Sequence, residues 1–531
     1  MIFQNDTIAA IATALSDSGI GIVRISGDKA IEIADSLIRS KSGKRMIASA
    51  KSHTIQYGFV IDDEDSKAFE NSSEFLVSDF FRIVDEVMVS VFRAPKSYTK
   101  EDVVEINCHG GVLVTKKVLE LVLRAGARLA EPGEFTKRAF LNGRIDLAEA
   151  EAVMDLIHSK NELAMKASTA QLRGDLSNKI RSLREGILYE IAFIESALDD
   201  PEHISLDGYP ERLNGKCDHL IAEVQRLLDS AENGRMVKEG ISTVILGKPN
   251  AGKSSLLNMI LGQERAIVTD VAGTTRDALE EYVNLRGIHL NMIDTAGIRD
   301  TDDLVEKIGV EKARKYAMDA DLILYVVDTS VALDENDKEI LSMINGKKTI
   351  FLLNKSDLEQ KVSENDILSL LRFVKDENQK DPTENNPTEN NSTENNTTES
   401  ISTENNSIER ISTEKNSLKY GEMESDISMI STSAALGEGL DLLEKEIEKL
   451  FFHGDVKQND QMMITNLRHK QELENAKNAL LLVKKSLEDG MPEDFYSIDL
   501  MQAYASLGSI VGEEVGDDLV EEIFSKFCMG K

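Results

Sequence analysis

The feature that most constrains this chain is the segment GKPNAGKS at residues 247–254, which fits the pattern G-x-x-x-x-G-K-[ST]. An apolar run at 244–246 precedes it and a helical pattern follows it. Glycines let backbone N–H groups wrap a chain of phosphates, and the start of the helix adds positive potential. Lys253 suits the β- and γ-phosphate oxygens, and Ser254 suits Mg²⁺. The segment therefore predicts a nucleotide-binding domain.

Strands and helices alternate around this loop. The apolar runs STVILG, HLNMIDTAG, DLILYVVDTS, KTIFLLNKSD and SMISTSA follow one another between residues 242 and 434. This alternation predicts a doubly wound, mostly parallel sheet. Residues 376–417 instead repeat Thr, Glu and Asn and have almost nothing to bury, so we expect a disordered, solvated insertion with no function of its own.

Two motifs downstream predict contacts with the metal and the γ-phosphate. Thr274 and Thr275 in AGTTRD offer the switch hydroxyl to Mg²⁺, and residues 294–297, DTAG, end a strand. Ile298 follows DTAG where a Ras-type GTPase has a Gln that orients water, and an aliphatic side chain cannot polarise water. Either hydrolysis is very slow or another group replaces that Gln. Glu306 in DLVEKIG is a candidate, and a solvated helix charge is the equal alternative.

The last two motifs predict the base that the site selects. Residues 354–357, NKSD, follow a strand, and the Asp357 carboxylate matches the N1–H and 2-amino donors of guanine. Adenine cannot return that bidentate contact. Ser433 and Ala434 follow SMIST and are expected in the final base-contacting loop. The motifs together predict GTP rather than ATP.

The rest of the chain predicts two further domains. Residues 1–142 alternate β-rich runs with helical patterns, which indicates an α+β domain. Residues 143–238 and 453–531 are dominated by long amphipathic helices, and neither segment is large enough to bury its apolar stripes alone. We expect them to form one discontinuous helical domain, with a G domain at residues 239–452 inserted between them.

Composition limits the partners and the compartment. A net charge of −33 argues against a surface coated with basic residues, so any contact with RNA requires a local basic patch. Cys108, Cys217 and Cys528 match no zinc pattern and suit a reducing compartment. No run of 18 uncharged apolar residues occurs, and the start of the sequence lacks the positive charge of a signal peptide. We therefore expect a cytoplasmic protein with no membrane segment.

The last four residues, CMGK, leave three interpretations of Cys528. A prenylation signal is disfavoured, because Gly530 and Lys531 fit its pattern poorly. A buried structural cysteine is possible, because the preceding helix is amphipathic and Phe524 and Phe527 are expected to pack inward. A reactive thiol brought to an active site by an ordered tail is the third interpretation.

Several segments together resemble the MnmE (TrmE) family of tRNA modification GTPases. They are DTIAAIAT, GIGIVRISG, PGEFTKRAFLNGRIDLAEAEAVMDLI, GKPNAGKSSLLN, AIVTDVAGTTRD, DTAGIRDTDDLVEKIG and IFSKFCMGK. The resemblance spans the chain apart from residues 357–427. It implies a homodimer that, with an FAD-dependent partner of the MnmG (GidA) type in a heterotetramer or larger complex, adds an aminomethyl-type group to C5 of the wobble uridine of certain tRNAs.

The resemblance also implies contacts at the nucleotide. K⁺ stands in for an arginine finger, and neutral oxygens hold it where phosphate charge develops. Glu306 aligns with the family's catalytic carboxylate. The implied K⁺ ligands are Asn250, Thr269, Val271 and Thr274, and the implied Mg²⁺ ligands are Ser254 and Thr275. The implied GTP contacts are Asn250, Ala251, Gly252, Lys253, Ser254, Ser255, Thr269, Asp270, Val271, Ala272, Gly273, Thr274, Thr275, Asp294, Thr295, Ala296, Gly297, Asn354, Lys355, Asp357, Ser433 and Ala434.

A second ligand is implied for the N-terminal domain, which in the family binds 5-formyl- or 5,10-methylene-tetrahydrofolate and dimerises. The matching residues are Arg24, Glu105, Arg144 and Lys531. A carboxylate suits the pterin N–H and amine groups, and cationic side chains suit the glutamate tail. Arg144 departs from the Lys that is common in the family. The tail of the family reaches this pocket, which makes Cys528 a candidate catalytic residue.

A rival interpretation is a GTP switch, such as a ribosome-assembly or RNA-binding factor without modification chemistry. Such a factor needs the nucleotide motifs, but it has no need of Arg24, Glu105, Arg144 or the Cys528 tail.

Overall fold

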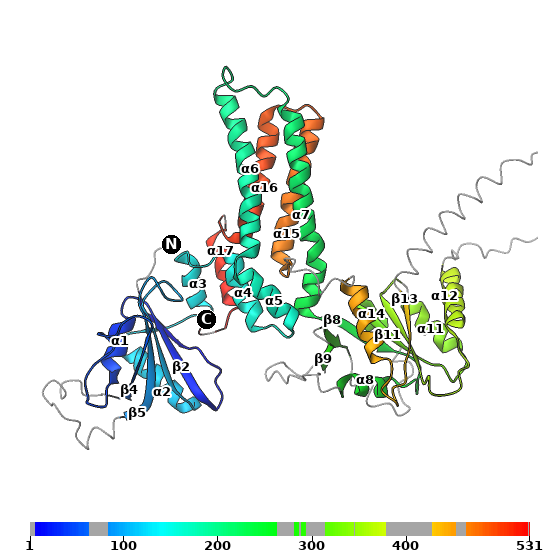
Figure 1. Cartoon of the computed structure of the whole chain (residues 1–531), viewed down its shortest axis with the longest axis horizontal. Helices are drawn as coiled ribbons and strands as arrows, with labels where there is room; N and C mark the ends of the chain where they lie inside the picture. Colours follow the sequence, from blue (N-terminus) through cyan, green and yellow to red (C-terminus); the bar gives the residue numbers. More distant parts are fainter. Residues whose placement is uncertain are drawn as a thin grey trace, which may run out of the picture. The chain divides into compact units, whose positions relative to one another are not determined.

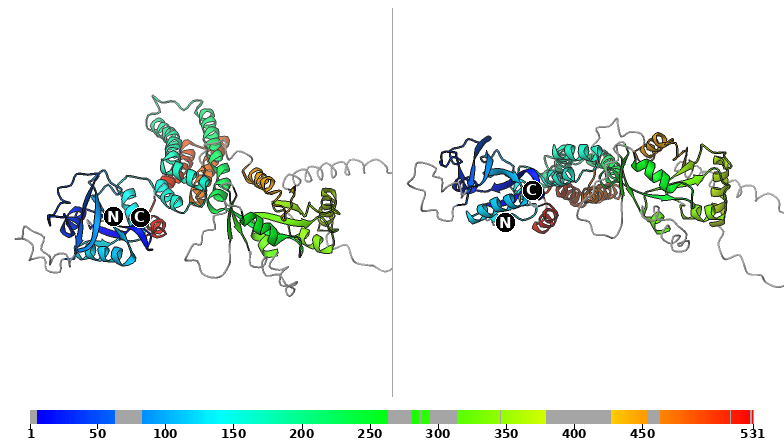
Figure 2. Two further views of the ribbon diagram at one scale, coloured as in Figure 1. Left: turned by 60° about the horizontal axis from the view of Figure 1, so that its bottom comes forward. Right: turned by 90° about the horizontal axis from the view of Figure 1, so that it is seen from below.

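The computed structural model describes residues 6–62, 83–262, 281–285, 288–293, 314–344, 346–378, 427–452, 463–513, 515–528 and 530. Contacts divide the chain into two compact units. Unit 1 comprises Met1–His158, Lys166–Leu228 and Leu467–Lys531, and unit 2 comprises Ser159–Met165 and Asp229–Asn466. Figures 1 and 2 show the elements of each unit, coloured along the chain.

The N-terminal part of unit 1 is a seven-stranded sheet with the order β3-β4-β5-β6-β2-β1-β7. Neighbouring strands are antiparallel, except that β7 runs parallel to β1. The bounds are β1 Ile8–Ile11, β2 Ser18–Ser26, β3 Ile38–Arg39, β4 Thr54–Ile61, β5 Ile83–Phe92, β6 Val103–Gly110 and β7 Arg128–Leu129.

Two helices, α1 (Ala30–Leu37) and α2 (Val112–Arg124), contribute to the core of this sheet. Side chains alternate between the faces of a strand, so Val23 and Ile25 are buried in that core while Arg24 belongs to the opposite face. Val104 and Ile106 are buried in the same way, and Glu105 between them shares the face of Arg24. The sheet therefore presents two charged residues on the face that its helices leave open.

The helical part of unit 1 joins helices from the middle and the end of the sequence. These are α3 (Glu134–Leu141), α4 (Leu147–Ile157), α5 (Glu162–Leu172), α6 (Asp175–Asp199), α7 (Tyr209–Glu239), α15 (Leu467–Glu488), α16 (Glu493–Val511) and α17 (Asp517–Ser525), with α5 and α7 running into unit 2. α16 packs against α15, α6 and α4 (Figure 1). Glu151 on α4 bonds Arg468 and His469 on α15. Helices far apart in the sequence thus pack together, as the amphipathic patterns predicted.

Unit 2 contains a six-stranded sheet with the order β13-β12-β11-β8-β10-β9. Every neighbouring pair is parallel except β10 with β9. The bounds are β8 Ile241–Leu246, β9 Glu281–Leu285, β10 Ile288–Met292, β11 Leu322–Asp328, β12 Thr349–Asn354 and β13 Ile427–Ser431. The predicted doubly wound, mostly parallel sheet is confirmed.

Helices cover both faces of this sheet. α8 (Lys253–Leu261) and α14 (Leu440–Phe452) share one apolar core with it, and α11 (Glu335–Met343) and α12 (Glu364–Asn378) share the other. The predicted disordered insertion begins at 376, inside α12, and from 379 onward it lies outside the described residues. In the parts of the chain that the structure describes, no helix is both long and apolar enough to cross a membrane.

Candidate functional sites

The phosphate-binding loop connects β8 to α8. Gly252 caps the helix with φ +101°, and a Cβ there would lie 2.2 Å from Asn354 Nδ2. Gly247 has φ +151°, and a Cβ there would lie 2.5 Å from the carbonyl oxygen of Val326. Both positions therefore require glycine, for conformation and for space. Asn250 also has positive φ, at 61°, which is uncommon for a residue with a side chain.

Lys253 points its ammonium group back into this loop. Its Nζ donates to the carbonyl oxygens of Gly247 and Lys248, each at 2.8 Å. Burial lowers the pKa of this amine, because the charged form is poorly solvated there. An anion beside the ammonium would offset that cost. The loop, the ammonium and the start of α8 therefore fit a phosphate chain.

One asparagine joins the three segments that the sequence assigned to the nucleotide. Asn354 Nδ2 donates to the carbonyl oxygen of Ala251 in the loop at 2.8 Å, and its Oδ1 accepts from the backbone N–H of Ala434 at 3.0 Å. The Ser433 hydroxyl donates to Asp357 Oδ1 at 2.7 Å. NKSD and the Ser433 loop therefore lie together beside the phosphate loop, and the carboxylate that would select guanine is held in place.

The structure describes only some of the other residues predicted for this site. Lys355 donates to Asp328 Oδ2 at 2.5 Å, and Ser254 and Ser255 lie in the first turn of α8. Outside the described residues lie Thr269, Asp270, Val271, Ala272, Gly273, Thr274, Thr275, Asp294, Thr295, Ala296, Gly297, Glu306 and Lys531.

A second constellation lies on the open face of the N-terminal sheet. Arg24 on β2 stands directly opposite Glu105 on β6, and Arg24 Nε lies 2.9 Å from Glu105 Oε1. The two side chains are 14% and 22% exposed, so a ligand can reach them while much of their surface is already out of water. Among the residues that the structure describes, this pair keeps guanidinium donors and one carboxylate oxygen without a hydrogen-bond partner, which suits a ligand with amine and carboxylate groups.

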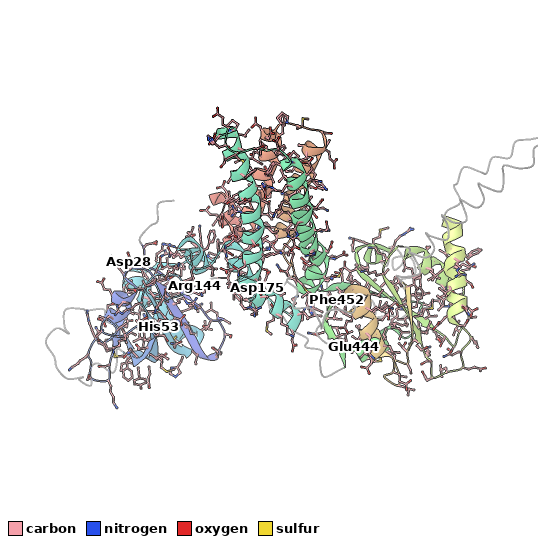
Figure 3. The ribbon with its side chains drawn as sticks, turned by 45° about the horizontal axis from the view of Figure 1, so that its top comes forward. Asp28, His53, Arg144, Asp175, Glu444 and Phe452 are labelled. Carbon is pink, nitrogen blue, oxygen red and sulfur yellow. The ribbon has the colours of Figure 1, made fainter. Side chains whose placement is uncertain are left out.

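Aromatic rings surround this pair. The Tyr98 ring lies 5.4 Å from the guanidinium carbon of Arg24 and 4.7 Å from that of Arg144. The Phe135 ring lies 5.6 Å from the guanidinium carbon of Arg24. Figure 3 labels Arg144, which follows α3. Neither ring was predicted as part of a site, because a single aromatic residue in a loop or a short helix usually packs in a core.

The C-terminal tail reaches the same place. Arg24 Nη1 donates to the carbonyl oxygen of Gly530 at 3.1 Å, and the N–H of Gly133 donates to the carbonyl oxygen of Cys528 at 3.3 Å. Phe524 and Phe527 are buried, as predicted, and they anchor the segment before the tail. The Cys528 thiol itself is exposed. Arg24, Glu105, Arg144 and the tail thus come together.

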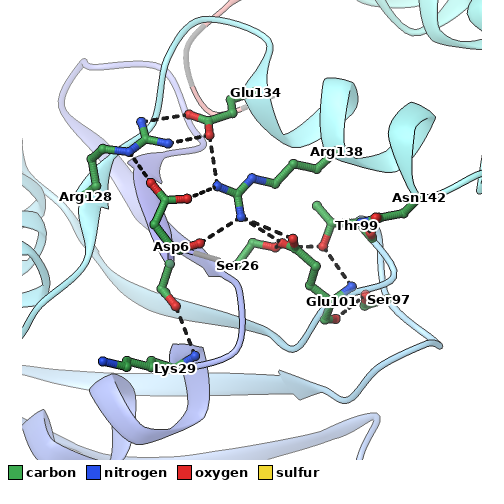
Figure 4. A network of polar contacts seen from close by, with 11 residues as sticks. Asp6, Ser26, Lys29, Ser97, Thr99, Glu101, Arg128, Glu134, Arg138 and Asn142 are labelled. Carbon is green, nitrogen blue, oxygen red and sulfur yellow. Dashed lines mark hydrogen bonds and ion pairs between the residues drawn. The ribbon is translucent and has the colours of Figure 1, made fainter. Parts of the chain in front are cut away.

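A network of charged residues connects the elements that carry the two aromatic rings (Figure 4). Arg138 on α3 bonds Asp6, Glu101 and Glu134, and Arg128 bonds Asp6 and Glu134. Burial alone would raise the pKa of Glu134, but hydrogen bonds from Arg128 and Arg138 bring it below its ordinary value. The network ties α3, which carries Phe135, to the loop that carries Tyr98.

Comparisons with known proteins agree across the whole chain. Residues 7–144 match the family described as "GTP-binding protein TrmE N-terminus", and residues 147–528 match "MnmE helical domain". Three relatives carry the name "tRNA modification GTPase MnmE". The one from Lachnoclostridium phytofermentans is 50% identical over 528 residues, covering 99% of this chain and 100% of the relative. Those from Carboxydothermus hydrogenoformans and Clostridioides difficile are each 44% identical, covering 99% and 100% of this chain and 100% of each relative.

Proposed function

Because this chain belongs to the MnmE family of tRNA modification GTPases, we propose that it hydrolyses GTP in order to modify the wobble uridine of certain tRNAs. The observation that carries the GTPase assignment is Asn354, which holds the phosphate loop and the base-selecting segments together. Asp357 would pair with guanine, and Lys253 with the β- and γ-phosphates.

Hydrolysis in this proposal depends on two cations. Mg²⁺ would be held by Ser254 and Thr275. K⁺ would be held by Asn250 together with oxygens of Thr269, Val271 and Thr274, and it supplies positive charge beside the phosphates where an arginine finger acts in other GTPases. The positive φ of Asn250 supports this role, since strained backbone tends to occur at functional positions. Glu306 would hold the attacking water.

The N-terminal constellation is the proposed site for 5-formyl- or 5,10-methylene-tetrahydrofolate. Glu105 would accept from the pterin amine and ring N–H, and Arg24, Arg144 and Lys531 would face the anionic parts of the ligand. The folate supplies the one-carbon unit. Support comes from the convergence of Arg24, Glu105, Arg144 and Gly530 at one place. The exposed Cys528 thiol would act beside this ligand.

The proposed reaction requires partners. We propose a homodimer that joins an FAD-dependent MnmG-type protein in a heterotetramer or larger complex, which together add an aminomethyl or carboxymethylaminomethyl group to C5 of the uridine. GTP hydrolysis would order the site rather than take part in the uridine chemistry. We place the reaction in the cytoplasm, where tRNA and reduced thiols such as Cys528 coexist.

The decisive experiment is mass spectrometry of wobble uridines from cells that lack this chain. We expect the C5 modification to disappear, to return with the wild-type chain, and to stay absent with Lys253→Ala or Cys528→Ser. Unchanged uridines in the deletion strain would overturn the enzyme assignment and favour the GTP-switch alternative.

The potassium assignment has its own test. GTP hydrolysis by the full chain should be several-fold faster in KCl than in NaCl, and Asn250→Ala should abolish that difference. Equal rates of the wild-type chain in the two salts would contradict the assignment of Asn250.

A further inference from the structure

Acidic residues are distributed unevenly along this chain. It has 94 Asp and Glu residues among 531, yet residues 36–61 and residues 240–263 contain none, and these are its two longest acid-free stretches. The second contains the phosphate-binding loop. The first contains five Lys and Arg residues, namely Arg39, Lys41, Lys44, Arg45 and Lys51. A strongly acidic protein thus keeps negative charge away from one further segment.

Four of these cations lie in the connection between β3 and β4. Lys41, Lys44, Arg45 and Lys51 are exposed and are called the basic loop below. Among the residues that the structure describes, no carboxylate lies within ion-pair distance of any of the four. Arg39 differs, because it is buried and its Nη1 donates to backbone carbonyl oxygens at the end of α1. Within the described parts of the chain, the basic loop therefore carries exposed positive charge without an ion-pair partner.

The backbone below these side chains is firmly anchored. Asp35 on α1 is buried, and its Oδ1 accepts from the N–H groups of Ile47 and Ala48 at 2.7 and 3.0 Å. Arg93 Nη2 donates to the carbonyl oxygen of Ala48 at 2.8 Å. A turn in which the Ser40 N–H donates to the Lys44 carbonyl at 2.9 Å holds the other end. The charges are therefore presented by an ordered backbone.

The basic loop runs from β3, whose Arg39 pairs with Phe59 of β4, to the end of the sheet where the folate constellation lies, and Lys51 is the cation nearest to that end. It leads into Thr54, which pairs with Val91 near the end of β5, and Phe92 pairs with Val103 at the start of β6. Glu105 is two residues further along β6. One strand separates β4 from β6, so the two strands lie about 10 Å apart. Ile47 and Ala50 of the loop pack in the core on the helix side of the sheet, so an RNA that contacts both the loop and Glu105 would pass around this end of the sheet. Figure 3 labels His53, the last residue before β4.

Nucleic acid fits this surface better than a lipid does. Phosphates of an RNA backbone repeat along the strand and are neutralised by Lys and Arg without regard to sequence. A membrane-docking loop needs apolar side chains to insert, but Ile47 and Ala50 of this segment are buried in the core. A uridine in a tRNA loop is unstacked easily and can be turned toward a pocket while its neighbours' phosphates stay on the protein surface.

We propose that the basic loop binds phosphates of the anticodon arm of tRNA and so directs the target uridine toward Arg24, Glu105 and Tyr98. This inference rests on the proposed function. Lys41, Lys44, Arg45 and Lys51 are then substrate-positioning residues, since they contact the backbone and not the base that reacts.

The test compares two triple variants of the full chain that lose the same charge. Lys41→Gln/Lys44→Gln/Arg45→Gln removes three cations of the basic loop. Lys166→Gln/Lys216→Gln/Lys485→Gln removes three exposed cations elsewhere. Binding of an anticodon stem–loop RNA with a wobble uridine is titrated by fluorescence anisotropy at several KCl concentrations, and GTP hydrolysis is measured in parallel.

We expect the loop variant to bind on the order of tenfold to a hundredfold more weakly, with the slope of log K against log salt reduced by about 2, while the control triple binds like the wild type. GTP hydrolysis should be unchanged in both. The variant Lys41→Arg/Lys44→Arg, which leaves Arg45 in place and keeps all three charges, should bind the RNA like the wild type.

Two outcomes overturn the inference. One is equal affinity and equal salt slope for the loop variant and the wild type. The other concerns anionic phospholipid vesicles: if the wild type binds them and the loop variant does not, while the loop variant still binds RNA, the loop is a lipid contact. These differ from failure of the proposed function, which would show as normal wobble uridines in the deletion strain.

Discussion

The Nη1 atom of Arg24 donates to the carbonyl oxygen of Gly530 at 3.1 Å, across 506 positions of sequence. Gly530 has φ +87°, and a Cβ there would lie 2.3 Å from the carbonyl oxygen of Ile11. The backbone at Gly530 therefore passes between Arg24 and the end of β1 in a space that only glycine fits. The position of the tail beside Arg24 depends on that passage.

Replacing Gly530 with alanine should displace the tail from Arg24. We expect affinity for 5-formyl-tetrahydrofolate to fall by on the order of tenfold, because the hydrogen bond from the charged Arg24 is lost and the tail no longer lies beside the proposed ligand site. Isothermal titration of the full chain measures the change. Gly516→Ala is the matched control, because its φ is −70° and no atom lies within 4 Å of the added Cβ. Equal folate affinity of the Gly530→Ala variant and the wild type would contradict the role of the tail.

Tyr98 should contribute through its ring rather than its hydroxyl. The ring lies beside two guanidinium groups, while the hydroxyl shares a 2.9 Å hydrogen bond with Thr136 Oγ1. Each cation–π contact contributes roughly 0.5–2 kcal/mol. We therefore expect Tyr98→Ala to weaken folate binding about tenfold and Tyr98→Phe to keep it within about threefold. A similar loss in both variants, measured by the same titration, would assign the effect to the hydroxyl.

Asp357→Asn should change the preferred nucleotide from GTP to xanthosine triphosphate. An amide at this position donates to the 2-oxo group of xanthine and leaves the 2-amino group of guanine without an acceptor. We expect a loss of about a hundredfold or more for GTP in a competition assay. Ser433→Ala, which removes only the hydroxyl that supports Asp357, should weaken GTP binding without making xanthosine triphosphate the preferred nucleotide. Unaltered preference in Asp357→Asn would place guanine recognition elsewhere.

His289 makes unit 2 sensitive to acid. Its ring is buried and stacks on Tyr282, with 5.4 Å between the ring centres. Burial, assisted by the charge of Lys160, lowers the pKa of His289 to about 4. In the unfolded chain the histidine pKa is near 6.5, so the unfolded state binds the proton first as the pH falls. The contribution of His289 to the free energy of unfolding is therefore fully present above about pH 6.5 and is lost as the pH falls toward 4.

Between pH 7 and 5 the free energy of unfolding of unit 2 should fall by about 2 kcal/mol through this group. Calorimetry of the full chain at the two pH values measures the fall, and His289→Phe should reduce it by that amount. His219→Gln, at an exposed position, serves as the control. A fall that is undiminished in His289→Phe would assign the acid sensitivity to another group.

Local patterns predicted the elements well and the long-range contacts poorly. The loop at 247–254 needed only its own residues and the flanking strand to identify a phosphate site, because its chemistry is local in sequence. The meeting of Arg24 with Gly530 has no local signal at all. Only the resemblance to a family linked the two ends, and the residues alone left three interpretations of Cys528 open.

The basic loop escaped prediction for a different reason. A net charge of −33 describes the whole surface and hides a short segment of opposite sign. That charge leaves a local basic patch as the place for any contact with RNA, and which lysines lack acidic neighbours depends on the fold. Lys117, for example, lies beside Asp62, whereas Lys44 lies beside no described carboxylate.

The guanidinium network around Arg138 has a consequence for how this domain responds to ions. Arg138 is 12% exposed and Glu134 is 11% exposed, so dissolved salt screens their attraction weakly. The cations of the basic loop face water and are screened fully. Under the two binding proposals made above, a rise in cellular electrolyte would release nucleic acid before it disturbs the buried ion pairs that hold Tyr98 and Phe135 in place, so that a bound one-carbon carrier would outlast many exchanges of substrate.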